Sequence, residues 1–256
     1  MGQIRLVPLA VAMRRAYGVI RLLESRNVGT RSGQHKGAIV MELDRAAQRA
    51  AWYDLAAGRR SIRRYDAVAV PAPTIRRLIE AACWAPSAHN RQPWRFAVLE
   101  DAAWKDRLAR AMGERLRADR LADGDAPELV EADVARSYAR IGAAPVVVVV
   151  LLDMADMDRY PDKRQRAEYL MAVQSTAMAV QNLLLAAHAE GLGACWMCAP
   201  LFCPDVVAEA LGLPQGWEPQ ALVTIGGPAN SGKPARREPV ESVLWTPSEG
   251  VKSRLP

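Results

Sequence analysis

The sequence predicts an α+β sandwich, in which a central sheet is flanked by helices. Residues 145–152, PVVVVVLL, form an unbroken and mostly β-branched run, which is typical of a strand buried on both faces. Residues 165–190 are apolar around most of a helical circumference, so we expect a long central helix there. The chain lacks the strict strand–helix alternation and the G-x-G-x-x-G turn of a doubly wound dinucleotide fold. The pattern therefore favours helices packed around a few buried strands.

The remaining elements follow from apolar periodicity and from turn residues. An amphipathic helix is predicted over residues 42–57, with Gly58 just after its end. Pro71 opens a second helix, which runs to about Trp84. The other predicted elements are helices over 102–121, 126–142 and 204–211, strands over 94–99, 194–197 and 220–225, and an extended tail from Gly226.

The net charge of +6 is concentrated at the N-terminus. The chain has 34 basic and 28 acidic residues, and residues 1–40 hold seven of the basic residues and one of the acidic ones. The rest of the chain therefore has 27 of each and is neutral. A neutral body offers no general attraction for polyanions, so we expect no nucleic-acid partner.

The composition also bears on domain organisation and compartment. We expect one domain over residues 42–248 and a C-terminal tail over 249–256. Residues 1–41 form an extension that is disordered, or a start placed too early with Met41 as the true beginning. The short apolar run over 6–13 contains Pro8 and no convincing cleavage site, so no secretory signal is predicted. Polar residues within 169–187 argue against a membrane span. We therefore expect a cytoplasmic protein with reduced thiols and no metal site.

The first motif is RRSIRR at residues 59–64. Guanidinium groups bind phosphate oxygens in pairs and stay charged, so several of them around one serine suit a phosphate. The alternative is a solvated basic stretch at the end of a helix. The composition alone does not decide between these two interpretations.

The second motif is APSAHNRQPWRF at residues 85–96. Its small residues would let the backbone approach a planar ligand closely, and Asn90 offers both a donor and an acceptor. The alternative is an ordinary turn that leads into a strand. His89 has no visible partner in the pattern, so we do not assign it a role as acid or base.

The two motifs together resemble the FMN-binding signature of the nitroreductase family. The similarity continues through EGLGACWM at residues 190–197 and LGLPQGWEPQALVTIGGPA at residues 211–229. It covers about residues 50–245. The resemblance implies a nitroreductase-like sandwich that shares its domains in a homodimer, with an FMN in each half of the interface. The flavin would carry out the chemistry, so no catalytic side chain is named.

The resemblance also implies which residues contact the cofactor. Those that would hold the phosphate and the ribityl chain are Arg59, Arg60, Ser61 and Arg63, with Arg237 of the basic tail and Lys233 as a second candidate there. Those that would come from the other subunit and line the ring are Pro86, Ser87, Ala88 and Asn90. Those that would pass the ring edge with their backbone N–H groups are Met197, Cys198 and Ala199, although Cys198 departs from the small residues typical of the family.

The cysteines at 195–198, CWMC, have a competing interpretation as a thioredoxin-like redox pair. Such a pair normally opens a helix, whereas Ala199 and Pro200 follow here. Packed, reduced cysteines are the interpretation we favour. Cys203 adds a third thiol nearby.

The sequence is compatible with three different substrates. Residues 159–196 resemble the flavin-binding half of the bifunctional enzyme of coenzyme F-420 biosynthesis, which implies reduction of the dehydro form of a deazaflavin precursor. The alternative within the family is a general NAD(P)H-dependent nitro- or quinone reductase acting by ping-pong transfer. A third alternative is a relative that destroys bound flavin to make a benzimidazole.

Overall fold

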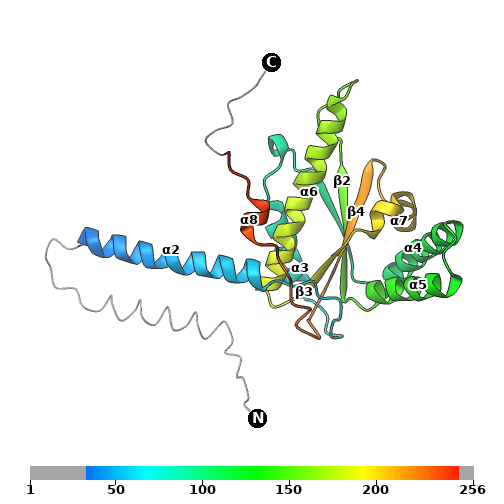
Figure 1. Cartoon of the computed structure of the whole chain (residues 1–256), viewed down its shortest axis with the longest axis horizontal. Helices are drawn as coiled ribbons and strands as arrows, with labels where there is room; N and C mark the ends of the chain where they lie inside the picture. The colour runs from blue at the N-terminus through cyan, green and yellow to red at the C-terminus, as the bar shows by residue number, and fades with distance from the viewer. Residues whose placement is uncertain (1–32, 248–256) are drawn as a thin grey trace, which may run out of the picture. The chain divides into compact units, whose positions relative to one another are not determined.

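The computed structural model of the chain describes residues 33–247, with side chains from residue 44 onward (Figure 1). The chain divides into two compact units, with the boundary after Asp54, and each unit is described by itself. The predicted N-terminal extension falls outside the described residues up to residue 32, and its last residues belong to helix α2 (Gly33–Gly58). The predicted tail over 249–256 also lies outside them. α2 begins before the predicted start because the helical backbone continues through a stretch without clear apolar periodicity.

The second unit is built on a four-stranded antiparallel sheet with the order β1-β2-β4-β3. Its strands are β1 (Trp94–Leu99), β2 (Val146–Asp153), β3 (Gly193–Met197) and β4 (Trp217–Gly226). All four predicted strands are confirmed. β4 begins three residues before its predicted start, because it pairs with the end of β2 beyond a register shift at Val150 and Leu151. Pro219 hid this part of the strand, since proline cannot donate to the ladder of a central strand.

Helices cover both faces of the sheet (Figure 1). The even-numbered residues of β2 from 146 to 150 pack with α3 and α6 in one hydrophobic cluster. The odd-numbered residues from 147 to 151 pack with α4, α5 and α7 in another. The helices are α3 (Ala72–Cys83), α4 (Ala102–Ala122), α5 (Pro127–Gly142), α6 (Arg164–Ala189) and α7 (Pro204–Leu211). The predicted α+β sandwich, with β2 buried on both faces, is therefore confirmed.

The predicted central helix is α6, which lies between the sheet and α3. Leu183 and Ala187 on α6 are fully buried, whereas Leu170 and Met178 are more than 40 % exposed. α6 is long and apolar enough to cross a membrane, but half of its most apolar stretch is buried inside the protein. α6 thus packs as a core helix that leaves some apolar side chains uncovered.

Three short helices within residues 33–247 were not predicted. These are the single turns η1 (Ala88–Asn90) and η2 (Ala199–Phe202) and the four-residue helix α8 (Val240–Val243). The prediction of an extended tail from Gly226 is wrong at α8. That turn closes through local hydrogen bonds, with the Ser242 hydroxyl donating to the Pro239 carbonyl at 2.7 Å. Single turns of this kind are too short to show apolar periodicity.

The edge of β3 is closed by a tight contact that depends on glycine. A Cβ atom on Gly193 would lie 2.7 Å from Cγ2 of Ile62 and 2.8 Å from its Cβ. Ile62 is β-branched and buried, so it has little freedom to move away. The segment around Ile62 can therefore lie against β3 only if residue 193 has no side chain.

We predict that Gly193→Ala destabilises the protein by about 1–3 kcal/mol, the usual cost of overpacking a well-packed site. Gly142→Ala is the matched control, because a Cβ there would meet nothing within 4 Å and Gly142 does not have a positive φ. Urea unfolding followed by circular dichroism measures both variants. Equal stability of the two variants would show that the Ile62 contact does not constrain the edge of β3.

Candidate functional site

The RRSIRR segment lies along the outer edge of β3. Ser61 forms a parallel bridge with Ala194, and the Ile62 N–H donates to the Ala194 carbonyl at 3.0 Å. Ile62 is buried while Ser61 and Arg63 are exposed, as expected when successive side chains of an extended segment point to opposite sides. The sheet edge therefore presents the serine and the arginine away from the core.

The end of this segment, residues 64–66, is hydrogen-bonded to the chain that follows β4. The Asp66 N–H donates to the Gly227 carbonyl at 2.9 Å, and the Ala229 N–H donates to the Arg64 carbonyl at 3.0 Å. The Tyr65 hydroxyl lies 2.8 Å from the hydroxyl of Thr224 on β4. Burial strongly raises the pKa of Tyr65, so this hydroxyl stays protonated and serves as an anchor.

Arg60 differs from its neighbours in having structural partners. Its guanidinium donates to the Ala57 carbonyl at 2.5 Å and to the Arg59 carbonyl at 2.8 Å. The first of these bonds satisfies a carbonyl in the last turn of α2, where helices leave acceptors unpaired. Arg60 was predicted as a phosphate ligand, and the structure shows its side chain capping a helix end.

The electrostatics indicate that positive charges converge here. Burial lowers the pKa of His188, at the end of α6, and the charges of Arg59 and Arg60 lower it further. Burial raises the pKa of the Cys195 thiol, whereas the charges of Arg63, Arg140 and Arg59 oppose that rise. Each of these arginines is thus close enough to influence a partly buried group at this edge.

Acidic partners do not neutralise this cluster. Among the described residues, none of Arg59, Arg60, Arg63 and Arg140 forms an ion pair. Arg140 was not predicted, since it lies about eighty residues from the motif and reaches it only through the fold. The sequence feature that could have pointed to Arg140 is its position in the last turn of α5, and this feature is weak evidence for a phosphate ligand.

The basic tail begins beside the same segment. Gly232 has a φ of +74°, and a Cβ on it would lie 2.9 Å from Cβ of Arg60 and 2.9 Å from Cδ1 of Ile62. Lys233 follows directly and is exposed. The side chain of Arg237 is also exposed and donates to the Arg236 carbonyl at 3.0 Å. The structure therefore brings the start of the tail to the cluster, but no described contact joins Arg237 to it.

The second motif forms a strained loop. His89, Asn90 and Gln92 have φ values of 50°, 53° and 48°, a region that side-chain-bearing residues seldom adopt. The Ser87 hydroxyl accepts a hydrogen bond from the Gln92 N–H at 3.0 Å. Strain of this kind is often found where a loop must present a particular surface to a ligand.

Each motif contacts α6 at a different position, so the distance between the motifs can be estimated along this helix. Gly58 contacts His188, since a Cβ on Gly58 would lie 3.0 Å from the imidazole Nε2. The Ala88 N–H donates to the hydroxyl of Ser175 at 3.2 Å. The thirteen steps from residue 175 to residue 188 correspond to about 20 Å along a helix that rises about 1.5 Å per residue. The two motifs are therefore separated within one chain.

The third predicted segment lies where β3 passes into η2. Met197 and Ala199 are half-buried against the second hydrophobic cluster, and Cys198 is exposed. The Trp196 indole N–H donates to the Cys198 sulfur at 2.8 Å. The cysteines are free thiols, and burial raises the pKa of both Cys195 and Cys203. The raised pKa of buried Cys195 keeps it as a thiol, which favours packing over a redox role because thiolates are the reactive form.

The residues around Ser61 fit an FMN phosphate. Such a phosphate carries close to two negative charges near pH 7, and guanidinium groups bind it through charge-assisted hydrogen bonds. Arg59, Arg63 and Arg140 supply positive charge without acidic partners, and Ser61 supplies an exposed hydroxyl. The loop over 86–90 of the same chain lies too far from Ser61 to contact an FMN whose phosphate is bound there.

The comparisons with known proteins identify the class. The family model described as the nitroreductase family matches residues 56–227. A protein named NADH dehydrogenase from Thermus thermophilus is 33% identical over 213 residues, which cover 73% of this chain and 92% of that protein. A 5,6-dimethylbenzimidazole synthase from Rhodospirillum rubrum is 32% identical over 171 residues, which cover 66% of this chain and 78% of that protein.

A solved structure agrees with these matches. A putative nitroreductase from Desulfovibrio desulfuricans, crystallised with FMN, superimposes with a TM-score of 0.59 at 30% identity, covering 77% of this chain and 96% of that one. The fold and the matched residues thus define an FMN-dependent oxidoreductase. The chain belongs to the nitroreductase family.

We predict a pH dependence of stability that arises from His188. Its pKa in the folded protein lies below the ordinary 6.5, so the unfolded chain binds a proton more readily. The free energy of unfolding is therefore highest above pH 6.5, where His188 is neutral in both states, and it falls as the pH drops below that value. Urea unfolding of the apo-protein between pH 7.5 and pH 5 measures it, with His188→Asn as the control variant. If His188→Asn shows the same loss at low pH, the effect has another source.

Proposed function

We propose that the chain passes electrons from a reduced nicotinamide dinucleotide to a small organic acceptor, using FMN bound at the arginine cluster around Ser61. The observation that carries this proposal is the convergence of arginines without acidic partners at the edge of β3. The relative named NADH dehydrogenase supports the choice of donor. FMN, when bound, supplies the capacity to accept and release electrons.

The proposed roles of the residues follow from their positions. Arg59, Ser61 and Arg63 hold the phosphate and the adjoining ribityl chain, and Arg140 adds positive charge. Arg60 keeps the helix end and the motif in place through its bonds to Ala57 and Arg59. The tail, with Lys233 and Arg237, closes over the phosphate after its turn at Gly232. The backbone over 197–199 faces the ring edge, and no side chain is assigned as acid or base.

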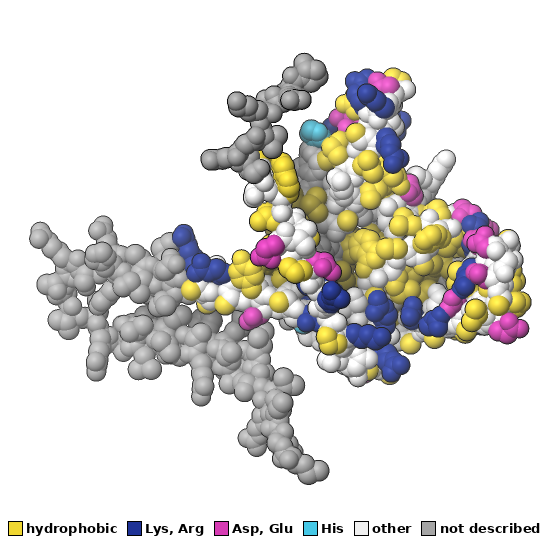
Figure 2. Space-filling model, viewed as in Figure 1, with side chains coloured by type: hydrophobic (Ala, Val, Ile, Leu, Met, Phe, Trp, Pro, Cys, Tyr) yellow, Lys and Arg dark blue, Asp and Glu magenta, His cyan; other side chains and the backbone are white. Residues whose placement is uncertain are grey.

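The proposed site is completed by a second copy of the chain. The loop over 86–90 lies about 20 Å from the cluster along α6, so it would contact the flavin of the partner in a homodimer. Hydrophobic side chains cover much of the middle of the molecule in Figure 2. Among the described residues, the exposed large hydrophobic side chains include Leu170, Met178, Leu201, Phe202 and Trp245. An apolar surface of this kind is typical of an interface between subunits.

A second candidate acceptor is the dehydro form of the deazaflavin precursor of coenzyme F-420. The sequence from Arg159 to Trp196 favours it, because this stretch resembles the corresponding enzyme of that biosynthesis. In this case the donor to FMN need not be a nicotinamide. The two candidates share the same flavin site and differ in what binds over the ring.

Anaerobic mixing of the purified protein with donors tests the function. A yellow protein whose flavin band is bleached by one equivalent of NADH or NADPH, and restored by menadione, has the proposed activity. Bleaching only by another donor, together with turnover of the dehydro precursor, assigns the second candidate. A coloured protein that neither dinucleotide bleaches contradicts the first, and loss of the flavin with formation of a benzimidazole contradicts both.

We predict that Arg63→Ala weakens FMN binding by roughly tenfold or more, because removing a hydrogen bond to a charged group costs about 1.5–3 kcal/mol. Arg76→Ala is the control, since Arg76 pairs with Glu80 on the exposed surface of α3. Titration of each apo-protein with FMN, followed by quenching of flavin fluorescence, gives the dissociation constants. Unchanged affinity in Arg63→Ala would remove this residue from the phosphate site.

A further inference from the structure

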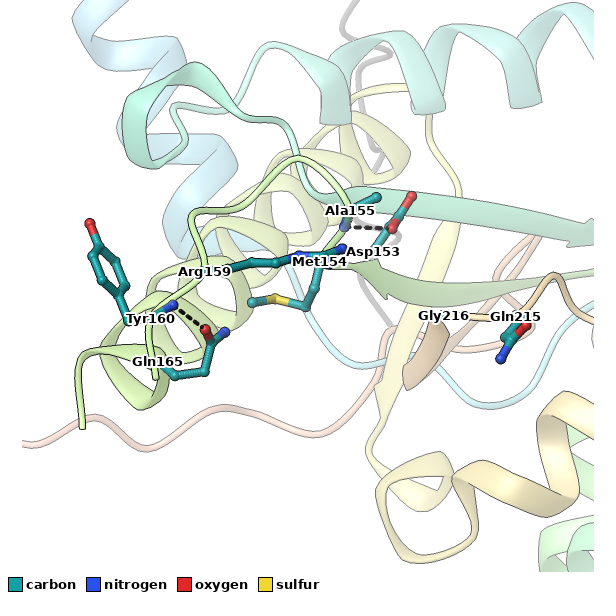
Figure 3. Close-up of a pocket in the computed structure, with 8 residues that line it drawn as sticks. All are labelled: Asp153, Met154, Ala155, Arg159, Tyr160, Gln165, Gln215 and Gly216. Carbon is teal, nitrogen blue, oxygen red and sulfur yellow. Dashed lines mark hydrogen bonds between the residues drawn. The ribbon is translucent and has the colours of Figure 1, made fainter. Parts of the chain in front are cut away.

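A hollow of about 550 Å³ lies at the end of the sheet opposite to the arginine cluster. It is open to solvent and is lined by the loop after β2, the first turn of α6 and the turn before β4 (Figure 3). Its lining residues are Asp153, Met154, Ala155, Arg159, Tyr160, Gln165, Gln215 and Gly216. This volume falls within the range of about 300–1,000 Å³ that is usual for small-molecule sites.

Side chains and backbone fix the shape of the hollow. The Gln165 side-chain oxygen accepts a hydrogen bond from the Tyr160 N–H at 2.9 Å, and the Asp153 carboxylate accepts one from the Ala155 N–H at 3.0 Å. Figure 3 shows Arg159 extending toward Met154, whereas Tyr160 points away from the hollow. The hollow thus combines an apolar thioether with a guanidinium on a loop held at both ends.

The same hollow is tied to the strained loop over 86–92. The Asp153 N–H donates to the Pro93 carbonyl at 2.8 Å, and Arg95 pairs with Asp153 at 2.9 Å. Arg91 reaches across to Asp158 at 2.9 Å. The loop that would line the flavin ring and the loop that lines the hollow therefore form one structural unit.

The lining of the hollow holds one acid, Asp153, which is paired with Arg95, and one base, Arg159. Residues 153–166 contain four acids and four bases, and Arg91 and Arg95 bring the total to six bases against four acids. Every one of these acids lies within ion-pair distance of an arginine. Among the described residues, Arg159 forms no ion pair. Figure 2 shows Lys and Arg side chains together with acidic ones at this end of α6, apart from the Lys and Arg side chains on the lower edge of the body.

We propose that this hollow binds the anionic group of the redox substrate, a phosphate or a carboxylate, and that Arg159 is its main ligand. The inference rests on the proposed function, since it assumes electron transfer at a flavin beside the loop over 86–92. A guanidinium suits this role because it binds two oxyanion oxygens at once. A dinucleotide donor and a deazaflavin precursor both carry such groups.

The hollow would serve the flavin of the partner subunit. Trp217, beside the hollow, and Gly226, beside the arginine cluster, mark the two ends of β4. The nine steps along the strand from Trp217 to Gly226 span about 30 Å at roughly 3.4 Å per residue. Each subunit would therefore hold the phosphate of one flavin and the substrate anion of the other.

Arg159→Gln tests the proposal in the holoenzyme, with Arg76→Gln as the matched control on the exposed surface of α3. The substitution removes the charge of an exposed side chain, so the flavin content of both variants should match that of the wild type. Binding of NADP⁺ to the oxidised holoenzyme is measured by titration. Stopped-flow mixing then gives the apparent dissociation constant and the limiting rate for NADPH, and the rate of reoxidation by menadione.

We expect Arg159→Gln to weaken NADP⁺ and NADPH binding roughly tenfold, about 1.4 kcal/mol, with little change in the limiting rate or in reoxidation by uncharged menadione. Arg159→Lys should recover part of the affinity. If Arg159→Gln weakens binding of the anionic deazaflavin precursor alone, the hollow binds the electron acceptor and not the dinucleotide donor. Unchanged binding of every anionic substrate, or an equal loss in Arg76→Gln, overturns the inference. A wild type that no donor reduces refutes the proposed function instead.

Discussion

The contact of Ile62 with Gly193 is the constraint from which the rest of the site follows. It holds an extended segment against β3, and the alternation of that segment turns Ser61 and Arg63 outward when Ile62 turns inward. Arg60 secures the entry to the segment by capping α2, and Tyr65 secures its exit on β4. The arginine cluster around Ser61 is thereby held in place by backbone pairing, although its positively charged side chains repel one another.

Such a cluster costs stability until an anion arrives, because like charges repel and no described acid offsets them. Burial is the main cause of the lowered pKa of His188, and the charges of Arg59 and Arg60 lower it further, because another positive charge beside them is unfavourable. An FMN phosphate would relieve this repulsion. The same positive charges that disfavour protonation of His188 thus favour a dianionic ligand.

Much of the fold could be predicted from the sequence because its strongest signals are local. The β-branched run of β2 and the apolar circumference of α6 fix two buried layers, and the two motifs are contiguous strings. Pro219 hid the start of β4, and α8 was too short to carry periodicity. Arg140 and the role of Arg60 as a cap depend on tertiary neighbours, so no pattern in the chain could reveal them. That Arg159 has no acidic partner likewise depends on tertiary contacts, since Arg91 and Arg95 pair with the neighbouring acids.

Each flavin site is proposed to draw on two chains, because α6 keeps the two motifs of one chain apart. Mixing Arg63→Ala subunits with Ser87→Trp subunits tests this proposal most directly, after subunit exchange has been verified by mass. Neither variant alone should hold flavin well, because each lacks one half of every site. Random exchange should restore about a quarter of the sites, since half of the dimers would be mixed and each would have one intact site. No recovery of flavin despite confirmed exchange, or a monomer that binds FMN at full affinity, would contradict the account.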